Sequence, residues 1–189
     1  MTVEEIFDKL SSHLVLGLMT HEQFCNYYDF LGLQGYKRCH EYHYMKENLA
    51  YRGICRYYIN HYNKLIPESK FENPEIIPAN WYKYTRFDVD ANTKKNAVKS
   101  GLQKWKEWET TTKKLYEQMF KELMNIDEVA AACKVKELVH DVDMELKKID
   151  RYILEKEAVN YDIGHIISEQ KHKHEKYKKK AEKMGINIC

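Results

Sequence analysis

The chain has 189 residues, 43% of them hydrophobic and 32% charged, and its 31 Lys and Arg nearly balance 29 Asp and Glu, giving a net charge of +2. This length suits one ordinary domain, and the charge balance excludes any whole-molecule argument for nucleic-acid or membrane binding. No stretch approaches about 18 consecutive apolar residues, and the N-terminal residues lack the features of a signal peptide. We therefore expect a cytoplasmic protein with no membrane-spanning segment, and the scarcity of Gly and Pro favours long helices.

The first part of the chain predicts two helices joined by a tight turn. Residues 3–32 place apolar side chains at steps of three and four, which is typical of a helix with one buried face. After a short break at Gly32–Gly35, residues 36–65 repeat the same step. Because so short a break leaves the chain little room, we expect the two helices to lie antiparallel and adjacent.

A second pair of helices is predicted after a long connection. Residues 66–97 hold all three prolines and no helical period, which indicates a segment running along the outside of the helices. The helical period returns from about Val98 to Asn125, and a fourth helix follows with Asp127 as its expected N-cap. Two antiparallel pairs joined by one long crossover predict a four-helix bundle.

The C-terminal segment, residues 161–189, lies beyond the bundle, which we assign to residues 1–160. Its lysine-rich run KHKHEKYKKKAEK predicts an additional helix with a solvated, basic outer half. Glu169 and His172 have a Glu-x-x-His spacing, for which a solvated face is the simpler interpretation. Binding of a phosphate-rich partner such as DNA through this segment is a lesser alternative.

Polar side chains occupy the predicted interior of the first two helices. His21, His43 and Glu47 share their helix faces with apolar residues such as Leu14. A carboxylate in such a place needs a hydrogen-bond partner, a shifted pKa or a metal ion. His43 and Glu47 are four residues apart on one helix, so they can bind one ion or hydrogen-bond each other, and the sequence leaves both interpretations open.

Several motifs resemble those of non-haem ferritins. The stretch YYDFLGLQGYKR at 27–38 is similar to the turn between the first two ferritin helices. IPESKFENPEIIPANW at 66–81, followed by GLQKWKEWETTTKKLY at 101–116, is similar to the ferritin crossover and the acidic start of the third helix. The similarity extends over about residues 3–155. It implies an all-α, ferritin-like four-helix bundle, with two antiparallel hairpins joined by a long crossover, and a C-terminal helix lies beyond it.

The resemblance also implies a set of metal ligands. Ferritins hold a two-iron centre inside the bundle, built from glutamates and a Glu-x-x-His or related acidic pair on facing helices. Leu14 and Ala50 stand where two of these ligands would be expected, so the set is only partly kept. On the fourth helix a Glu-x-x-His spacing occurs, although it flanks the apolar face. The candidate metal ligands are Glu47, Glu109, His43, His21, Glu137 and His140.

These features lead to two functional hypotheses. The first is a protein that binds iron, or manganese as the second choice for oxygen and nitrogen ligands, and that oxidises or stores iron. The second is a metal-free bundle that serves as a non-catalytic interaction or assembly module, which the replacements at Leu14 and Ala50 favour. A homo-oligomer is expected from the ferritin resemblance.

Overall fold

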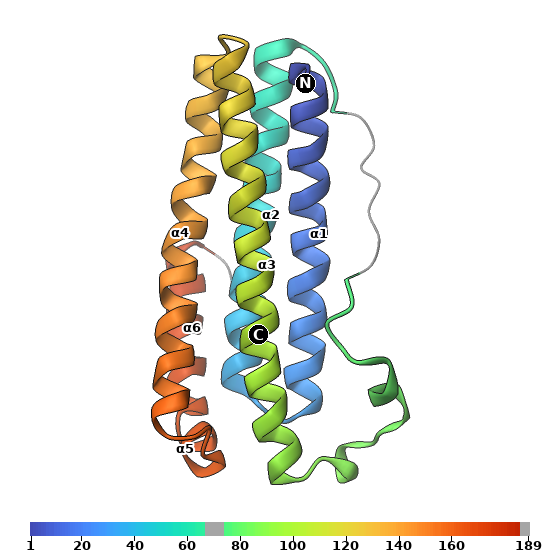
Figure 1. The fold of residues 1–189 in the computed structure, drawn as a ribbon, viewed down its shortest axis with the longest axis vertical. Helices are drawn as coiled ribbons and strands as arrows, with labels where there is room; N and C mark the ends of the chain where they lie inside the picture. The colour runs from blue at the N-terminus through green and yellow to red at the C-terminus, as the bar shows by residue number, and fades with distance from the viewer. Residues whose placement is uncertain (67–73, 186–189) are drawn as a thin grey trace.

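The computed structural model describes residues 1–66 and 74–185, and every regular element within them is a helix (Figure 1). The prediction of an all-α protein is therefore confirmed. Within the described residues, no helix combines the length and apolar composition needed to cross a membrane. The elements are α1 (Val3–Phe30), α2 (Gln34–Tyr62), η1 (Ala79–Lys83), η2 (Arg86–Asp88), α3 (Ala91–Asn125), α4 (Val129–Ala158), α5 (Ile163–Ser168) and α6 (Gln170–Lys183), where η1 and η2 are short 3-10 helices.

The four long helices lie side by side and form two antiparallel pairs (Figure 1). α1 and α2 are joined by a turn in which Gly32 has φ of +70°, a conformation that glycine adopts without strain. α2 ends at the opposite end of the molecule from the start of α3, so these two helices run in the same direction (Figure 1). α3 and α4 then form the second antiparallel pair.

Two predicted helix starts differ from those in the structure. The third helix begins at Ala91 and not near Val98, because the side chain of Asp90 accepts a hydrogen bond from the backbone N–H of Thr93 at 2.6 Å and caps an earlier turn. Asp127 is not the N-cap of the fourth helix. It takes a left-handed backbone conformation with φ of +61°, which turns the chain, and Glu128 occupies the N-cap position.

The interior contains two apolar clusters, one rich in tyrosine and tryptophan and one mostly aliphatic. On α1 the aliphatic cluster extends to Leu14 and the aromatic cluster begins at Phe24. On α3 the aromatic cluster extends to Trp105 and the aliphatic cluster begins again at Tyr116. The same gap recurs on α2 and α4, so a middle layer of the interior is left for polar side chains.

The C-terminal helix α6 packs against α2 and contributes to the aromatic cluster. The two helices approach closely at Gly35, where an added Cβ would lie 2.6 Å from the backbone oxygen of Gln170. Tyr177 is fully buried, and Glu169 contacts the fully buried Lys156 of α4 at 2.5 Å. The prediction that Glu169 lies on a solvated face is therefore wrong. Its carboxylate is the partner that the buried ammonium of Lys156 requires.

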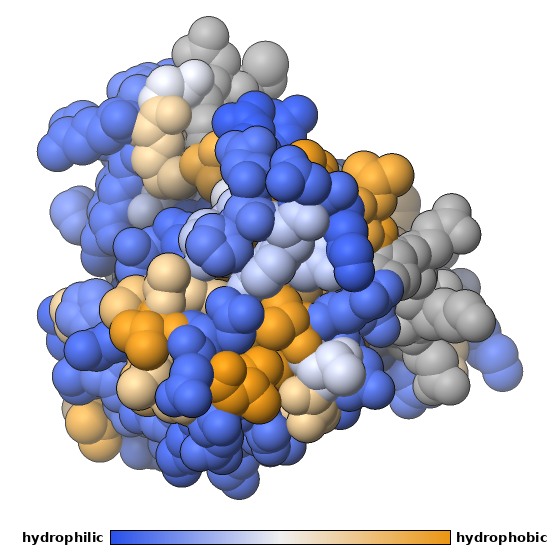
Figure 2. All heavy atoms as spheres, turned by 90° about the horizontal axis from the view of Figure 1, so that it is seen from above, coloured by the Kyte–Doolittle hydropathy of each residue, from blue (hydrophilic) through white to orange (hydrophobic). Residues whose placement is uncertain are grey.

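The end of the molecule that holds the α3–α4 turn is mainly hydrophilic, with a few apolar patches (Figure 2). Exposed apolar side chains on or beside this turn are Met124, Ile126 and Val129, whose exposed fractions lie between 39% and 54%. Such scattered apolar residues are ordinary on a protein surface, so this end gives no strong sign of a binding site.

Candidate metal site

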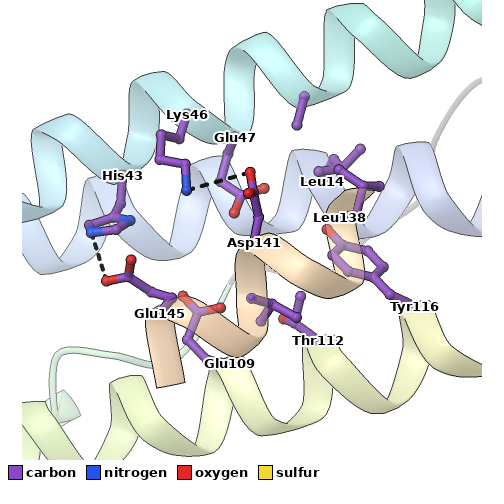
Figure 3. Close-up of a pocket in the computed structure, with 12 residues that line it drawn as sticks. Leu14, His43, Lys46, Glu47, Glu109, Thr112, Tyr116, Leu138, Asp141 and Glu145 are labelled. Atoms are coloured by element: carbon purple, nitrogen blue, oxygen red, sulfur yellow. Dashed lines mark ion pairs between the residues drawn. The ribbon is translucent and has the colours of Figure 1, made fainter. Parts of the chain in front are cut away.

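A polar cavity of about 50 Å³ lies in the middle layer, between the two apolar clusters (Figure 3). Side chains from all four long helices line it, with α1 contributing Leu14. The cavity is large enough for more than one water-sized group. Its polar lining residues are His43, Lys46, Glu47, Glu109, Thr112, Tyr116, Asp141 and Glu145.

One half of the cavity has its charges paired. Glu145 of α4 contacts Nε2 of His43 at 3.0 Å and Nζ of Lys148 at 2.5 Å. Burial alone would raise the pKa of Glu145, but its contacts with His43 and Lys148 lower the pKa well below its usual range. At the surface, Lys46 pairs with Asp141 at 3.7 Å (Figure 3). We call His43, Glu145 and Lys148 the paired half.

The other half contains two carboxyl groups with no lysine or arginine partner. Glu47 from α2 and Glu109 from α3 point into the same cavity (Figure 3), and neither forms an ion pair with a lysine or arginine of residues 1–66 or 74–185. Burial raises the pKa of Glu47 to about 7. Burial, together with the charge of Glu47, raises the pKa of Glu109 to about 8. Both groups therefore hold protons near neutral pH, because burial raises their pKa values more than the positive charge of Lys46 lowers them.

A fully buried histidine completes this second half. Among the residues that the structure describes, His21 Nε2 has no hydrogen-bond partner, and Oε1 of Glu109 lies 3.8 Å from it. The other ring nitrogen, Nδ1, lies 3.1 Å from Nδ1 of His40. Burial lowers the pKa of His21 well below its usual value, so the ring is neutral. We call His21, Glu47 and Glu109 the unpaired half.

Four of the six residues predicted from the sequence meet in or beside this cavity. His43, Glu47 and Glu109 line it, and His21 contacts Glu109 from α1. The direct hydrogen bond considered between His43 and Glu47 is not formed, because His43 is directed toward Glu145 and Lys148 instead. The His43–Glu47 alternative is therefore replaced by a larger network.

Glu137 and His140 do not take part. Both side chains are exposed, and Glu137 pairs with Lys134 on its own helix. A residue on an α-helix is turned by about 100° from its neighbour, and at this height the inward positions of α4 belong to Leu138 and Val142. Their Glu-x-x-His spacing is correct, but it lies on the wrong face of the helix.

Sequence reasoning missed three residues of the network: Glu145, Lys148 and His40. Glu145 lies three residues after the buried Val142 and four before the buried Ile149, so the helical step itself could have identified it. Lys148 gave no such signal, because lysine is seldom placed in an interior. His40 lies four residues after the buried Tyr36 and three before the buried His43, so the helical step could have identified it too.

The types of donor atom in the cavity suit a divalent metal ion, but the side chains do not lie close enough together to hold one in their present positions. Within residues 1–66 and 74–185, no three His, Cys, Asp or Glu side chains are gathered closely enough to hold an ion. The unpaired half nevertheless offers two carboxyl groups and a neutral imidazole nitrogen without a hydrogen bond. These are the oxygen and nitrogen ligands that iron and manganese accept.

Comparison with known proteins adds no relative from which a function could be transferred. No protein-family model, no curated protein and no solved structure matches this chain. The interpretation of the cavity consequently depends on its own residues.

Proposed function

We propose that this protein is a ferritin-like four-helix bundle that binds a metal ion, iron before manganese, through Glu47, Glu109 and His21. The topology of two antiparallel helix pairs, with α2 and α3 running in the same direction, supports the ferritin-like assignment. A bound iron would supply one-electron chemistry, and oxidation of Fe(II) is the activity that the ferritin resemblance implies.

The observation that carries this proposal is the two buried carboxyl groups of the unpaired half, which form no ion pair with a lysine or arginine of the described residues. Two glutamates share one buried cavity, while the neighbouring lysines are engaged by other carboxylates. Removing carboxylates from water is costly unless a cation or a proton neutralises them. A metal ion would replace the protons that now neutralise Glu47 and Glu109.

The histidine pair supports the same assignment. When His21 donates its Nδ1–H to Nδ1 of His40, the lone pair of His21 Nε2 is left free toward Glu109. Histidines that bind metal ions commonly donate their second ring nitrogen in this way, because the hydrogen bond fixes the tautomer and the ring orientation. His40 would then be a positioning residue for His21.

The decisive experiment measures metal content. Protein purified without chelators and reloaded anaerobically with Fe(II) is compared with a Glu47→Ala, Glu109→Ala variant. The Glu137→Ala, His140→Ala variant is a matched control, because it removes the same donor types from the exposed face of α4. We expect about one iron per chain in the wild type and the control, and almost none in the first variant.

The same measurement decides between the two hypotheses from the sequence. If no metal binds in any of the three proteins, the metal proposal is wrong and the chain is a metal-free bundle whose role lies in interaction or assembly. Retention of iron in the Glu47→Ala, Glu109→Ala variant would place the ion elsewhere. The homo-oligomer and the contact of the basic helix with nucleic acid stay predictions.

A further inference from the structure

Lys148 lies inside the molecule beside the proposed metal site. Its side chain is only 12% exposed. Its ammonium nitrogen lies 2.5 Å from Oε1 of Glu145 and 3.0 Å from Nε2 of His43. It also lies over the aromatic rings of Trp105 and Tyr177, at 5.4 and 5.1 Å from their centroids. Residues of α2, α3, α4 and α6 thus hold one positive charge in a fixed place.

The two polar partners of Lys148 have the separation of metal ligands. Nε2 of His43 and Oε1 of Glu145 are 3.0 Å apart. When two donor atoms each lie about 2.1 Å from one ion and the donor–ion–donor angle is a right angle, the two donors are also about 3.0 Å apart. An imidazole nitrogen and a carboxylate oxygen are therefore already assembled around a cation, and that cation is the ammonium group.

We propose that Lys148 is a tethered cation that fills a second cation position and limits the protein to one metal ion. This inference rests on the proposed function, since His43 and Glu145, which hold the ammonium group, line the same cavity as Glu47 and Glu109. Lys148 would thus be a residue that determines the stoichiometry of metal binding. A positive charge beside His43 and Glu145 repels a divalent ion, and the lysine also fills the space that the ion would need.

The aromatic rings explain why the ammonium stays in this place. A lysine ammonium is attracted to the faces of tryptophan and tyrosine rings, and the attraction is stronger where water is excluded. Tyr177 is fully buried and belongs to α6, so the C-terminal helix helps to hold the internal cation. The packing of α6 therefore helps to keep the ammonium group of Lys148 beside His43 and Glu145.

The inference is tested by the number of manganese ions bound per chain. Mn(II) is titrated by equilibrium dialysis into the full-length wild type and the Lys148→Ala and Lys148→Arg variants. The electron paramagnetic resonance spectrum reports whether two bound ions are close enough to couple. We expect about one ion in the wild type and in Lys148→Arg, which keeps the positive charge, and about two coupled ions in Lys148→Ala. Adding His43→Ala to Lys148→Ala should return the number to about one.

The outcomes separate this inference from the proposed function. If Lys148→Ala binds no more manganese than a wild type that binds one ion, the inference is wrong and the proposed function stands. If the wild type binds none and Lys148→Ala gains an ion, the proposed function is wrong for the native protein and the role of Lys148 is supported. If neither protein binds manganese, both are wrong.

A second readout covers the case in which Lys148→Ala folds poorly without metal. The thermal unfolding midpoint is then measured with and without Mn(II). We expect the added ion to raise the midpoint of Lys148→Ala more than that of the wild type, since it replaces the lost positive charge. An equal rise in both proteins would overturn the inference.

Discussion

The two halves of the central cavity contain glutamates of opposite behaviour. Glu145 and Glu109 are both buried, at 9% and 4% exposure, and they line the same cavity. The pKa of Glu145 lies well below its usual range, whereas that of Glu109 is raised to about 8. Burial acts in the same direction on both groups, so it cannot explain the difference.

The difference arises from the presence of a cation. Glu145 has the ammonium of Lys148 at 2.5 Å, three residues along the same helix. Glu109 accepts a hydrogen bond from Nε1 of Trp105 at 3.0 Å but forms no ion pair with a lysine or arginine in the described part of the chain. A buried carboxylate thus remains ionised when the fold supplies a cation and takes up a proton when it does not. By the same reasoning, the unpaired half is the place where an external cation would bind.

The largest expected effect is a difference in the free energy of unfolding between two variants, one with a glutamate of the paired half replaced and one with a glutamate of the unpaired half replaced. Glu145→Gln leaves the Lys148 ammonium without its carboxylate, which should lower the free energy of unfolding by about 3 kcal/mol. Glu109→Gln replaces a protonated carboxyl by an amide that can still accept from Trp105, and should cost less than about 1 kcal/mol. Urea unfolding of the metal-free proteins near neutral pH measures both. Equal costs would show that the two halves do not differ in charge pairing.

An intermediate effect is expected in the pH dependence of stability. Above about pH 7.5 the histidines whose pKa values burial lowers are neutral in the folded protein and about nine-tenths neutral in the unfolded chain. Glu47 and Glu109, with folded pKa values of about 7 and about 8, still bind protons that the unfolded chain has lost. The free energy of unfolding of the metal-free protein should therefore fall as pH rises from about 7.5 to about 8, by at most about 1.4 kcal/mol per pH unit for each group.

The control for this pH dependence is the Glu47→Gln, Glu109→Gln variant. An amide does not titrate, so the fall between about pH 7.5 and pH 8 should largely disappear. Glu145, whose pKa is lowered, is ionised in both states over this range and should contribute no slope. A variant that kept the slope of the wild type would mean that other groups cause it.

The smallest effect concerns the space around Glu47. A Cβ added at Gly17 would lie 3.3 Å from Cδ of Glu47, so Gly17→Ala should displace this carboxyl by a few tenths of an ångström. We expect a severalfold loss of metal affinity. The free energy of unfolding should change little, because the roughly 0.5–1 kcal/mol that alanine gains over glycine within a helix offsets the cost of displacing the carboxyl.

Gly53→Ala is the matched control on α2. An added Cβ there meets no atom within 4 Å, so this change should stabilise the protein and leave metal binding unaltered. The two variants are compared by manganese titration and by urea unfolding. If both left the affinity unchanged, the position of the Glu47 carboxyl would not matter for binding.

Helical periodicity in the sequence predicted much of the site as well as the fold. His21, His43, Glu47 and Glu109 stand at positions where the apolar step places the interior, and the structure finds all four there. Glu137 and His140 were candidates through their Glu-x-x-His spacing, although the apolar step placed them beside the buried face of the helix, and both side chains are exposed. Glu145 satisfied the step and was overlooked.

The sequence by itself determined that this protein is helical, approximately where its long helices lie, and that His21, His43, Glu47 and Glu109 face inward. These properties are local, since they follow from the period of a helix and the chemistry of its turns. Only the tertiary structure decided that Lys148 enters the interior, that α6 packs on α2, and that Glu145 and Glu109 differ in charge. A pKa and an ion pair depend on groups that are distant in the sequence, and folding alone brings them together.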